Sequence, residues 1–246
     1  MRDLHTHTVF SDGKDTPEDM ILAAIDRGLD TIGISDHAHA VTDDVSMSPE
    51  KAEEYRREMA RLKAEYGSRI RILCGAEQDY YSDDPAEYDY SVGSVHAIVM
   101  PDGQAVVVDW TPDRLEKWVG TYFAGDWYAL AEAYYALEAD VVRKTKCDII
   151  GHFDLLTKFN EKCRFFDETH PRYIRAWQHA ADTLLKTGKP FEINTGAIAR
   201  GWRTTPYPAE PVCGYIKEHG GHLILNSDCH CKENLCFRFE EWQRLL

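Results

Sequence analysis

The sequence Asp3-Leu4-His5-Thr6-His7, followed closely by Ser11-Asp12-Gly13, lies at the start of the chain and gives the first indication of its fold. In an extended segment alternate side chains point to the same side, so His5 and His7 face one way and Thr6 faces the other. Two imidazoles on one side of a strand can bind the same metal ion. A strand that ends in this way, with a carboxylate shortly after it, predicts the first part of a metal site.

Residues of the same kinds follow the other apolar segments of the chain. These residues are His37 after 31–35, Glu77 after 70–75, His96 after 90–95, His152 after 147–151, and Asp228 and His230 after 222–226. A carboxylate directly after an apolar strand is costly to bury unless it is paired or bound to a metal. The remaining histidines lie in loops, on helix faces or at the start of a strand, and we predict that they are not ligands: His39, His170, His179, His219 and His222.

Short apolar strands alternate with amphipathic helices along the chain. Thr16-Pro17 and Ser48-Pro49 are typical helix starts, with a capping hydroxyl followed by proline at the first helical position, and Gly28 is a typical helix end. Seven such alternations predict an α/β fold with a parallel sheet that is closed or nearly closed into a barrel. In such barrels the chemistry takes place at the C-terminal ends of the strands.

The remaining segments fit one domain that spans residues 1–246. The segment from Ala97 to Gly125 is the least regular, and we expect an edge strand at 105–108 and otherwise a long loop. Apolar residues from Trp127 to Val141 predict one long helix, and a final helix is expected to close the chain. No repeat or linker interrupts this pattern.

Composition excludes several classes of function. The net charge of −14 argues against nucleic-acid binding, because no basic stripe would neutralise phosphates. No apolar segment approaches the ~20 residues of a membrane span, and no signal peptide is recognisable, so a cytoplasmic location is expected. The seven cysteines do not suggest a disulfide framework, and Cys229, Cys231 and Cys236 lack the paired spacing of a structural zinc site.

The candidate ligands combine imidazole and carboxylate without an essential thiolate, which suits Zn, Mn or Fe. Their number exceeds what one tetrahedral ion needs, so we expect two or three divalent ions with Glu77 as a bridging carboxylate. The ions would make the pocket locally positive in an acidic protein. That pocket would bind the phosphate of a small phosphorylated metabolite, and a water on the metal would supply hydroxide near neutral pH. The sequence gives no prediction of the oligomeric state.

The strand-end motifs resemble those of the PHP (polymerase and histidinol phosphatase) superfamily. The matching segments, in order, are His5-Thr6-His7, Asp36-His37, Gly75-Ala76-Glu77, Gly93-Ser94-Val95-His96, Gly151-His152-Phe153-Asp154 and Ser227-Asp228-Cys229-His230. Three further segments are similar to the histidinol-phosphatase branch in particular, namely Gly125-Asp126-Trp127, Glu192-Ile193-Asn194-Thr195-Gly196 and Pro206-Tyr207-Pro208.

This resemblance implies a distorted (β/α)7 TIM-like barrel with three metal ions at the C-terminal ends of the strands. It assigns the ligands as His5, His7, Glu77 and Asp228 for one ion, Glu77, His96 and His152 for a second, and His37, His230 and Asp12 for a third.

The family reaction would be hydrolysis of L-histidinol phosphate to L-histidinol and inorganic phosphate. Asp228 or a metal-bound water would give a proton to the departing alkoxide. Arg164 and Arg200 are candidate ligands of the phosphate oxygens, because the guanidinium fork suits phosphate geometry. Asp79, two residues beyond Glu77, is a candidate partner for the ammonium group of the substrate.

Three other functions are compatible with parts of this pattern. A different PHP phosphoesterase, acting on nucleotides, sugar phosphates or phosphodiesters, would keep every ligand and change only the loops. An amidohydrolase-type C–N hydrolase also begins with His-x-His, but such enzymes commonly use a modified lysine as the bridge, where Glu77 is the candidate here. A non-catalytic metal-binding module would be expected to lack some of the ligands.

Overall fold

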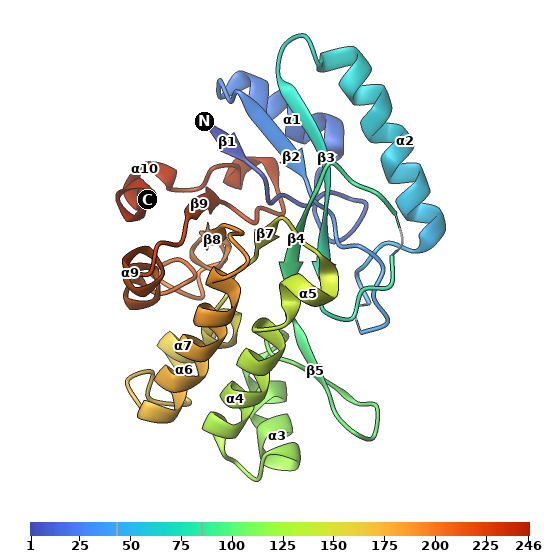
Figure 1. Cartoon of the computed structure of the whole chain (residues 1–246). Helices are drawn as coiled ribbons and strands as arrows, with labels where there is room; N and C mark the ends of the chain where they lie inside the picture. The colour runs from blue at the N-terminus through green and yellow to red at the C-terminus, as the bar shows by residue number, and fades with distance from the viewer. Residues whose placement is uncertain (43, 85) are drawn as a thin grey trace.

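The computed structural model describes residues 1–42, 44–84 and 86–246, and a seven-stranded parallel sheet forms its centre (Figure 1). The strand order is β1-β2-β3-β4-β7-β8-β9, so strands that follow one another along the chain are neighbours in the sheet. The bounds are β1 (Arg2–Asp3), β2 (Thr31–Ile34), β3 (Arg71–Asp79), β4 (Tyr90–Ser94), β7 (Ile149–Ile150), β8 (Phe191–Asn194) and β9 (Leu223–Asn226).

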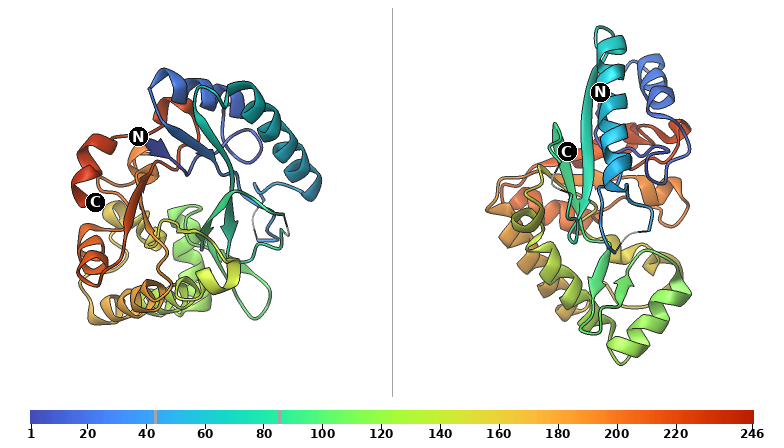
Figure 2. Two further views of the ribbon diagram at one scale, coloured as in Figure 1. Left: turned by 45° about the horizontal axis from the view of Figure 1, so that its top comes forward. Right: turned by 90° about the vertical axis from the view of Figure 1, so that its right-hand side faces the viewer.

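The first and last strands meet, which nearly closes the sheet into a barrel (Figure 2, left). Thr6 forms an isolated parallel bridge with Cys229, and the Leu4 amide donates to Asn226 Oδ1 at 3.0 Å. The Ser227 amide donates to Asp3 Oδ1, also at 3.0 Å. Closure therefore depends on side-chain hydrogen bonds as well as on a backbone ladder, and the barrel is distorted at this seam.

Helices surround the sheet on its outer side (Figures 1 and 2). Their bounds are α1 (Pro17–Asp26), α2 (Pro49–Tyr66), α3 (Pro112–Tyr122), α4 (Trp127–Glu138), α5 (Val141–Thr145), α6 (Asn160–Cys163), α7 (Pro171–Leu185), α8 (Gly196–Ala199), α9 (Glu210–Glu218) and α10 (Phe239–Trp242). The predicted helix starts are confirmed, because Thr16 forms a capping box with Asp19 and Ser48 caps α2. Gly28 follows α1 with a φ of 71°, as expected of a residue that ends a helix.

Two predictions about secondary structure were wrong. The segment from Ala97 to Gly125 is not mainly a loop: β5 (Ala97–Val99) and β6 (Ala105–Val107) form a hairpin, and α3 follows. The single long helix after Trp127 is two helices, α4 and α5. The predicted final helix is confirmed as α10, which is short and is followed directly by the 3-10 turn Gln243–Leu245. In addition, β3 is longer than the predicted strand 70–75, so Glu77 lies within it.

One large side chain, Tyr90, lies against two strands at positions where each carries glycine. Tyr90 is buried and its hydroxyl donates to the Leu4 carbonyl at 2.7 Å. A Cβ at Gly33 would lie 2.1 Å from the Tyr90 hydroxyl oxygen, and one at Gly75 would lie 2.3 Å from its ring. Only glycine at both positions leaves room for this tyrosine beneath the ends of β1, β2 and β3.

Two larger apolar clusters fix the helices against the sheet. One lies between the sheet and α1 and α2, around the fully buried Met20, Tyr55 and Met59. The other holds α4 and α7 against β7 and β8, around Tyr134 and Phe191. Within the described parts of the chain, every helix is too short or too polar to span a membrane.

Candidate metal centre

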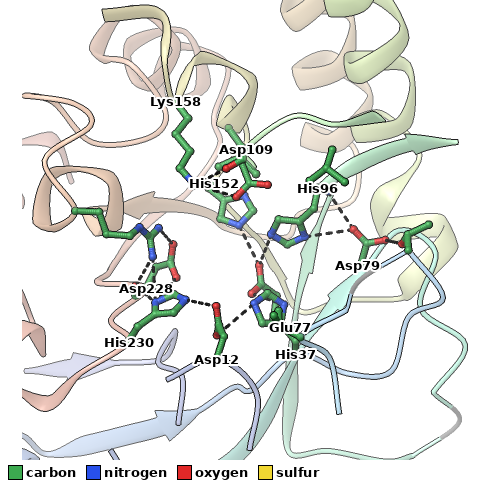
Figure 3. Close-up of a pocket in the computed structure, with 15 residues that line it drawn as sticks. Asp12, His37, Glu77, Asp79, His96, Asp109, His152, Lys158, Asp228 and His230 are labelled. Carbon is green, nitrogen blue, oxygen red and sulfur yellow. Dashed lines mark hydrogen bonds and ion pairs between the residues drawn. The ribbon is translucent and has the colours of Figure 1, made fainter. Parts of the chain in front are cut away.

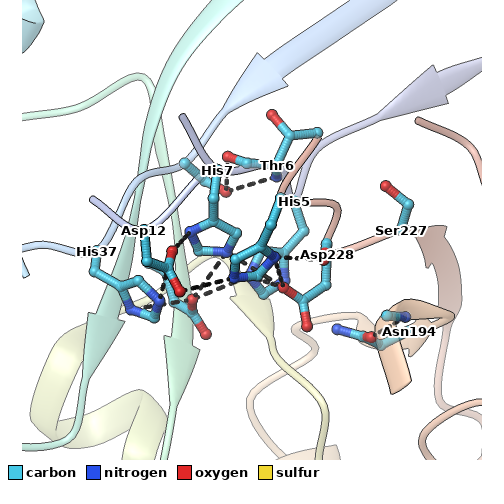
Figure 4. A network of polar contacts seen from close by, with 12 residues as sticks. His5, Thr6, His7, Asp12, His37, Asn194, Ser227 and Asp228 are labelled. Carbon is cyan, nitrogen blue, oxygen red and sulfur yellow. Dashed lines mark hydrogen bonds and ion pairs between the residues drawn. The ribbon is translucent and has the colours of Figure 1, made fainter. Parts of the chain in front are cut away.

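The histidines of the first strand lie side by side at the C-terminal end of the barrel (Figure 4). His5 and His7 are fully buried, with ring centroids 5.1 Å apart. The Thr6 hydroxyl points to the neighbouring strand instead and donates to the Gly33 carbonyl at 3.0 Å. This alternation is the one expected from the extended His-Thr-His sequence.

The Glu77 carboxylate lies at the centre of the site, with histidines on both of its oxygens (Figure 3). Oε2 lies 3.1 Å from His5 Nε2, 3.4 Å from His7 Nε2 and 3.4 Å from His37 Nδ1. Oε1 lies 3.0 Å from His152 Nε2 and 3.4 Å from His96 Nε2. A carboxylate with donor atoms on each side has the geometry of a ligand shared by two ions.

Three groups of side chains can each surround one ion, with their ligand atoms within 4.8 Å of one another. They are His7, Asp12, His37 and His230; His5, His7 and Asp228; and His37, Glu77 and His96. His152 reaches the third group through Glu77. The groups share His7 and His37, so the site is one continuous cluster at the C-terminal ends of β1, β2, β3, β4 and β9.

Two properties of the cluster fit divalent cations. The Nε2 atoms of His5 and His7 are buried and make no hydrogen bond within the described residues, so a metal ion could bind each of them in place of a proton. Burial disfavours the charged form of Glu77, yet His5 and His37 hold its pKa well below its usual value. Burial also lowers the pKa of His5, but Glu192 and Glu77 outweigh it and raise that pKa well above the usual range. The carboxylates thus attract positive charge, which metal ions supply in place of protons.

A second set of carboxylates orients the candidate ligands from behind. Glu192 is fully buried; its Oε1 lies 2.7 Å from His5 Nδ1, and its Oε2 accepts from the His152 amide at 2.9 Å. Asp79 Oδ2 accepts from the His96 amide and lies 3.3 Å from His96 Nδ1. A hydrogen bond to Nδ1 fixes the tautomer that leaves the Nε2 lone pair free for a metal.

The cluster lines a cavity of about 240 Å³ that opens to the surface. Arg200, at the end of α8, lies on its wall and donates to Asp228 Oδ2 at 2.8 Å. Burial disfavours ionisation of Asp228, but Arg200 and His5 hold its pKa well below the usual value. A Cβ at Gly196 would lie 2.7 Å from Asp228 Oδ2 and 2.8 Å from Arg200 Nη2, so this ion pair requires glycine there.

All the side chains predicted as metal ligands come together in this cluster. Asp79 and Arg200 also line the cavity, whereas Arg164 is exposed and is not among the lining residues. The histidines predicted not to be ligands lie elsewhere: His39 pairs with Asp83, and His170 caps α7. The roles of the predicted site residues as ligands, as substrate-binding groups and, for Asp228, in catalysis remain predictions.

Sequence reasoning missed two charged residues on the cavity wall, Lys158 and Asp109. Lys158 lies six residues before Arg164 in the same segment, and Asp109 directly follows the apolar segment 105–108. A charged residue at the end of an apolar segment was the signal that identified the other site residues. It applied to Asp109 as well, but the hairpin that brings Asp109 to the barrel mouth was not predicted.

Comparison with known proteins agrees with this geometry. A family model described as the PHP domain matches residues 3–196. A Schizosaccharomyces pombe protein named probable histidinol-phosphatase is 28% identical over 234 residues, which cover 87% of this chain and 74% of the relative. The histidinol-phosphatase of Lactococcus lactis is 31% identical over 243 residues, which cover 93% of this chain and 83% of the relative.

A solved structure has the same fold. The crystal structure of histidinol phosphate phosphatase from Lactococcus lactis, complexed with zinc, L-histidinol and phosphate, matches with a TM-score of 0.75 and 22% sequence identity, covering 99% of this chain and 91% of that chain. Because the family model spans most of the sequence and the barrel gathers the strand-end residues at one mouth, the chain belongs to the PHP domain family.

Proposed function

We propose that the protein is a metal-dependent phosphomonoesterase that hydrolyses L-histidinol phosphate to L-histidinol and inorganic phosphate, in histidine biosynthesis. The observation that carries the proposal is the Glu77 carboxylate, which has histidine nitrogens at both oxygens on the floor of an open cavity. Two relatives that match most of the chain carry the name histidinol-phosphatase. Zinc, L-histidinol and phosphate in the related crystal structure support the same reaction.

The proposal includes two or three divalent ions, which would be Zn, Mn or Fe. Their ligands would be the residues of the cluster described above, with Glu77 shared between ions and Asp12 with His230 at the cavity entrance. When bound, such ions polarise a phosphoryl oxygen and lower the pKa of a water molecule enough to give hydroxide near neutral pH.

The protein side chains would bind and orient the ester. Arg200 has a guanidinium whose planar fork suits phosphate oxygens, and its contact with Asp228 directs it along the cavity wall. Asp228 has a strongly lowered pKa, so it is ionised near neutral pH and would accept a proton more readily than donate one. The cavity of about 240 Å³ is at the small end of ligand sites, which suits a metabolite of this size.

The alternative functions would require different residues or substrates at the site. A C–N hydrolase of the amidohydrolase type would use a bridging lysine. Within the described residues, the lysine on the cavity wall is Lys158, which is bonded to Asp109 rather than placed between the candidate ligands. A phosphoesterase for nucleotides or sugar phosphates would use the same ligands, so substrate comparison must separate it.

The test is phosphate release from L-histidinol phosphate, AMP and glucose 6-phosphate, measured with the same metal-loaded protein. We expect the highest kcat/KM on L-histidinol phosphate, with loss of activity after chelation and recovery when zinc or manganese is added back. Elemental analysis of the purified protein would give the number and identity of the ions. A kcat/KM on AMP or glucose 6-phosphate above that on L-histidinol phosphate would refute the proposed substrate.

A further inference from the structure

Lys158 and Asp109 form an ion pair on the cavity wall, across from Asp12 and Glu77 (Figure 3). Lys158 follows the 3-10 turn Leu155–Thr157, and Asp109 follows β6, so the pair joins the hairpin to the loop after β7. Lys158 Nζ donates to Asp109 Oδ2 at 3.0 Å and to the Asp109 carbonyl at 2.8 Å. These contacts fix the ammonium next to the position where a substrate would bind.

Each member of the pair has hydrogen-bonding capacity left over. An ammonium has three donors, and within residues 1–42, 44–84 and 86–246 its two acceptors both belong to Asp109. In the same parts of the chain, Asp109 Oδ1 accepts no hydrogen bond from the protein, and the Asp109 side chain is 24% exposed, so a ligand can reach it. Lys158 is only 9% exposed, so solvent does not easily satisfy the third donor. Burial raises the pKa of Asp109, but Lys158 and His96 outweigh it and lower the pKa to about 2. The carboxylate is therefore charged near neutral pH.

Asp109 lies where the cavity lined by the candidate metal ligands adjoins a second cavity of about 290 Å³. The second cavity is lined by Thr42, Asp44, Val45, Val107, Asp109 and Trp110. Its wall combines aliphatic and aromatic groups with carboxylates, whereas the first cavity is lined by the candidate metal ligands. A substrate held by its phosphate in the first cavity would extend its alcohol portion past Asp109 into the second.

The other charged groups on the wall are already engaged. Asp79 Oδ1 accepts from the Tyr81 amide and the Thr42 hydroxyl, and its Oδ2 is occupied by His96. Arg200 is bonded to Asp228 on the other side of the cavity. Asp109 is thus better placed than Asp79 to accept a hydrogen bond from a substrate ammonium group.

We propose that Asp109 and Lys158 recognise the leaving group, and so select phosphate esters that carry an ammonium group on the carbon next to the ester carbon. Asp109 Oδ1 accepts a hydrogen bond from that ammonium, Lys158 donates its third hydrogen bond to a phosphate oxygen, and the ring of the alcohol lies in the second cavity against Trp110. The inference rests on the proposed function and specifies how its substrate is recognised.

The experiment compares L-histidinol phosphate with 3-(imidazol-4-yl)propyl phosphate, which lacks only the amino group. Asp109→Asn should reduce the ratio of kcat/KM for the two esters at least ~10-fold, because it removes a charged hydrogen-bond acceptor. Lys158→Gln should lower kcat/KM on both esters and weaken inhibition by inorganic phosphate ~10-fold or more, with Lys158→Arg partly restoring both. The matched controls Asp113→Asn and Lys162→Gln, exposed in the same segments, should leave both esters unaffected.

Metal content and melting temperature of each variant are measured alongside the kinetics. An unchanged substrate ratio in a folded, metal-loaded Asp109→Asn, or unchanged phosphate inhibition in Lys158→Gln, would overturn the inference. If either variant does not fold, inhibition of the wild-type protein is measured instead, with p-nitrophenyl phosphate as the substrate. L-histidinol should then inhibit ~10-fold more strongly than its amine-free analogue, and equal inhibition overturns the inference. Failure of the wild type to hydrolyse L-histidinol phosphate would refute the proposed function separately.

Discussion

Replacing Glu77 by glutamine tests the metal centre at the atom on which it depends most. Glutamine has the same shape, but it removes a negative charge that faces histidines on both sides. It also converts one oxygen into an NH2 group, which donates where a ligand must accept. Whichever way the amide is turned, either the His5, His7 and His37 side or the His96 and His152 side loses its acceptor.

The magnitude follows from the number of contacts. Substitution of a residue that merely orients a metal ligand typically costs about 10–100-fold in affinity. Glu77 is expected to bind directly and to serve two ions, so we expect metal affinity to fall by more than ~100-fold, or about 2.7 kcal/mol, at each of them. Since such ions would supply hydroxide near neutral pH, kcat/KM should fall by at least ~10³-fold.

Competition with a chromophoric chelator measures the affinity, and elemental analysis measures the content. Glu87→Gln is the matched control, because it makes the same substitution at an exposed residue a short distance along the chain, and it should behave as wild type. A Glu77→Gln protein with wild-type metal affinity and turnover would show that the carboxylate is not a ligand, and the shared-ligand argument would be wrong.

Three further substitutions probe the surroundings of the centre. Glu192→Gln should lower zinc affinity about 10–100-fold without unfolding the protein, because the His5 Nδ1 partner no longer dictates the tautomer; wild-type affinity in a chelator competition would contradict this. Gly196→Ala should displace the Asp228–Arg200 pair and reduce kcat/KM more than ~10-fold. The control Gly214→Ala, in a helix with open space around it, should keep wild-type activity and unfold at an equal or higher temperature. Equal activity of the two variants would count against the steric argument. Burial raises the pKa of Glu138 well above its usual value, so this group stabilises the fold fully below about pH 4.5 and progressively less as pH rises. The free energy of unfolding of Glu138→Gln, measured in urea, should therefore increase relative to wild type by about 1.4 kcal/mol per pH unit between pH 5 and 7. A constant difference would show that Glu138 ionises normally in the folded protein.

Local sequence signals predicted the regular elements of the fold well. The capping hydroxyl and proline at Thr16-Pro17 and Ser48-Pro49 identified two helices at the correct residue, because a cap depends on neighbours in the sequence. The strand β6 was predicted at 105–108, but its hairpin partner β5 and the helix α3 were not, since their apolar residues pack on distant elements. Val106 and Leu115 belong to the same cluster as Tyr134 and Phe191, and no short stretch of sequence reveals that contact.

The candidate site was predictable where a residue follows a strand, and less so where it lies on a connecting loop. His5, Glu77 and Asp228 meet because parallel strands deliver their C-terminal ends to the same mouth. Arg164 was predicted as a phosphate ligand from the segment after β7, and the charged residue of that segment on the cavity wall is Lys158. Which side chain of a loop faces inward depends on turns such as Leu155–Thr157, whose direction is set by packing rather than by periodicity.

The seam between β1 and β9 has a consequence for how the protein reaches its native state. The ring centroids of His7 and His230 lie 4.4 Å apart, although more than two hundred residues separate them along the chain. An ion bound by both would therefore link the first and last strands of the barrel. Closing so long a loop costs conformational entropy, and binding energy available only in the closed form offsets that cost. The contact between β1 and β9 should therefore become more stable as the free zinc concentration rises, and amide hydrogen exchange at residues 4–8 and 226–230 should slow as metal is added.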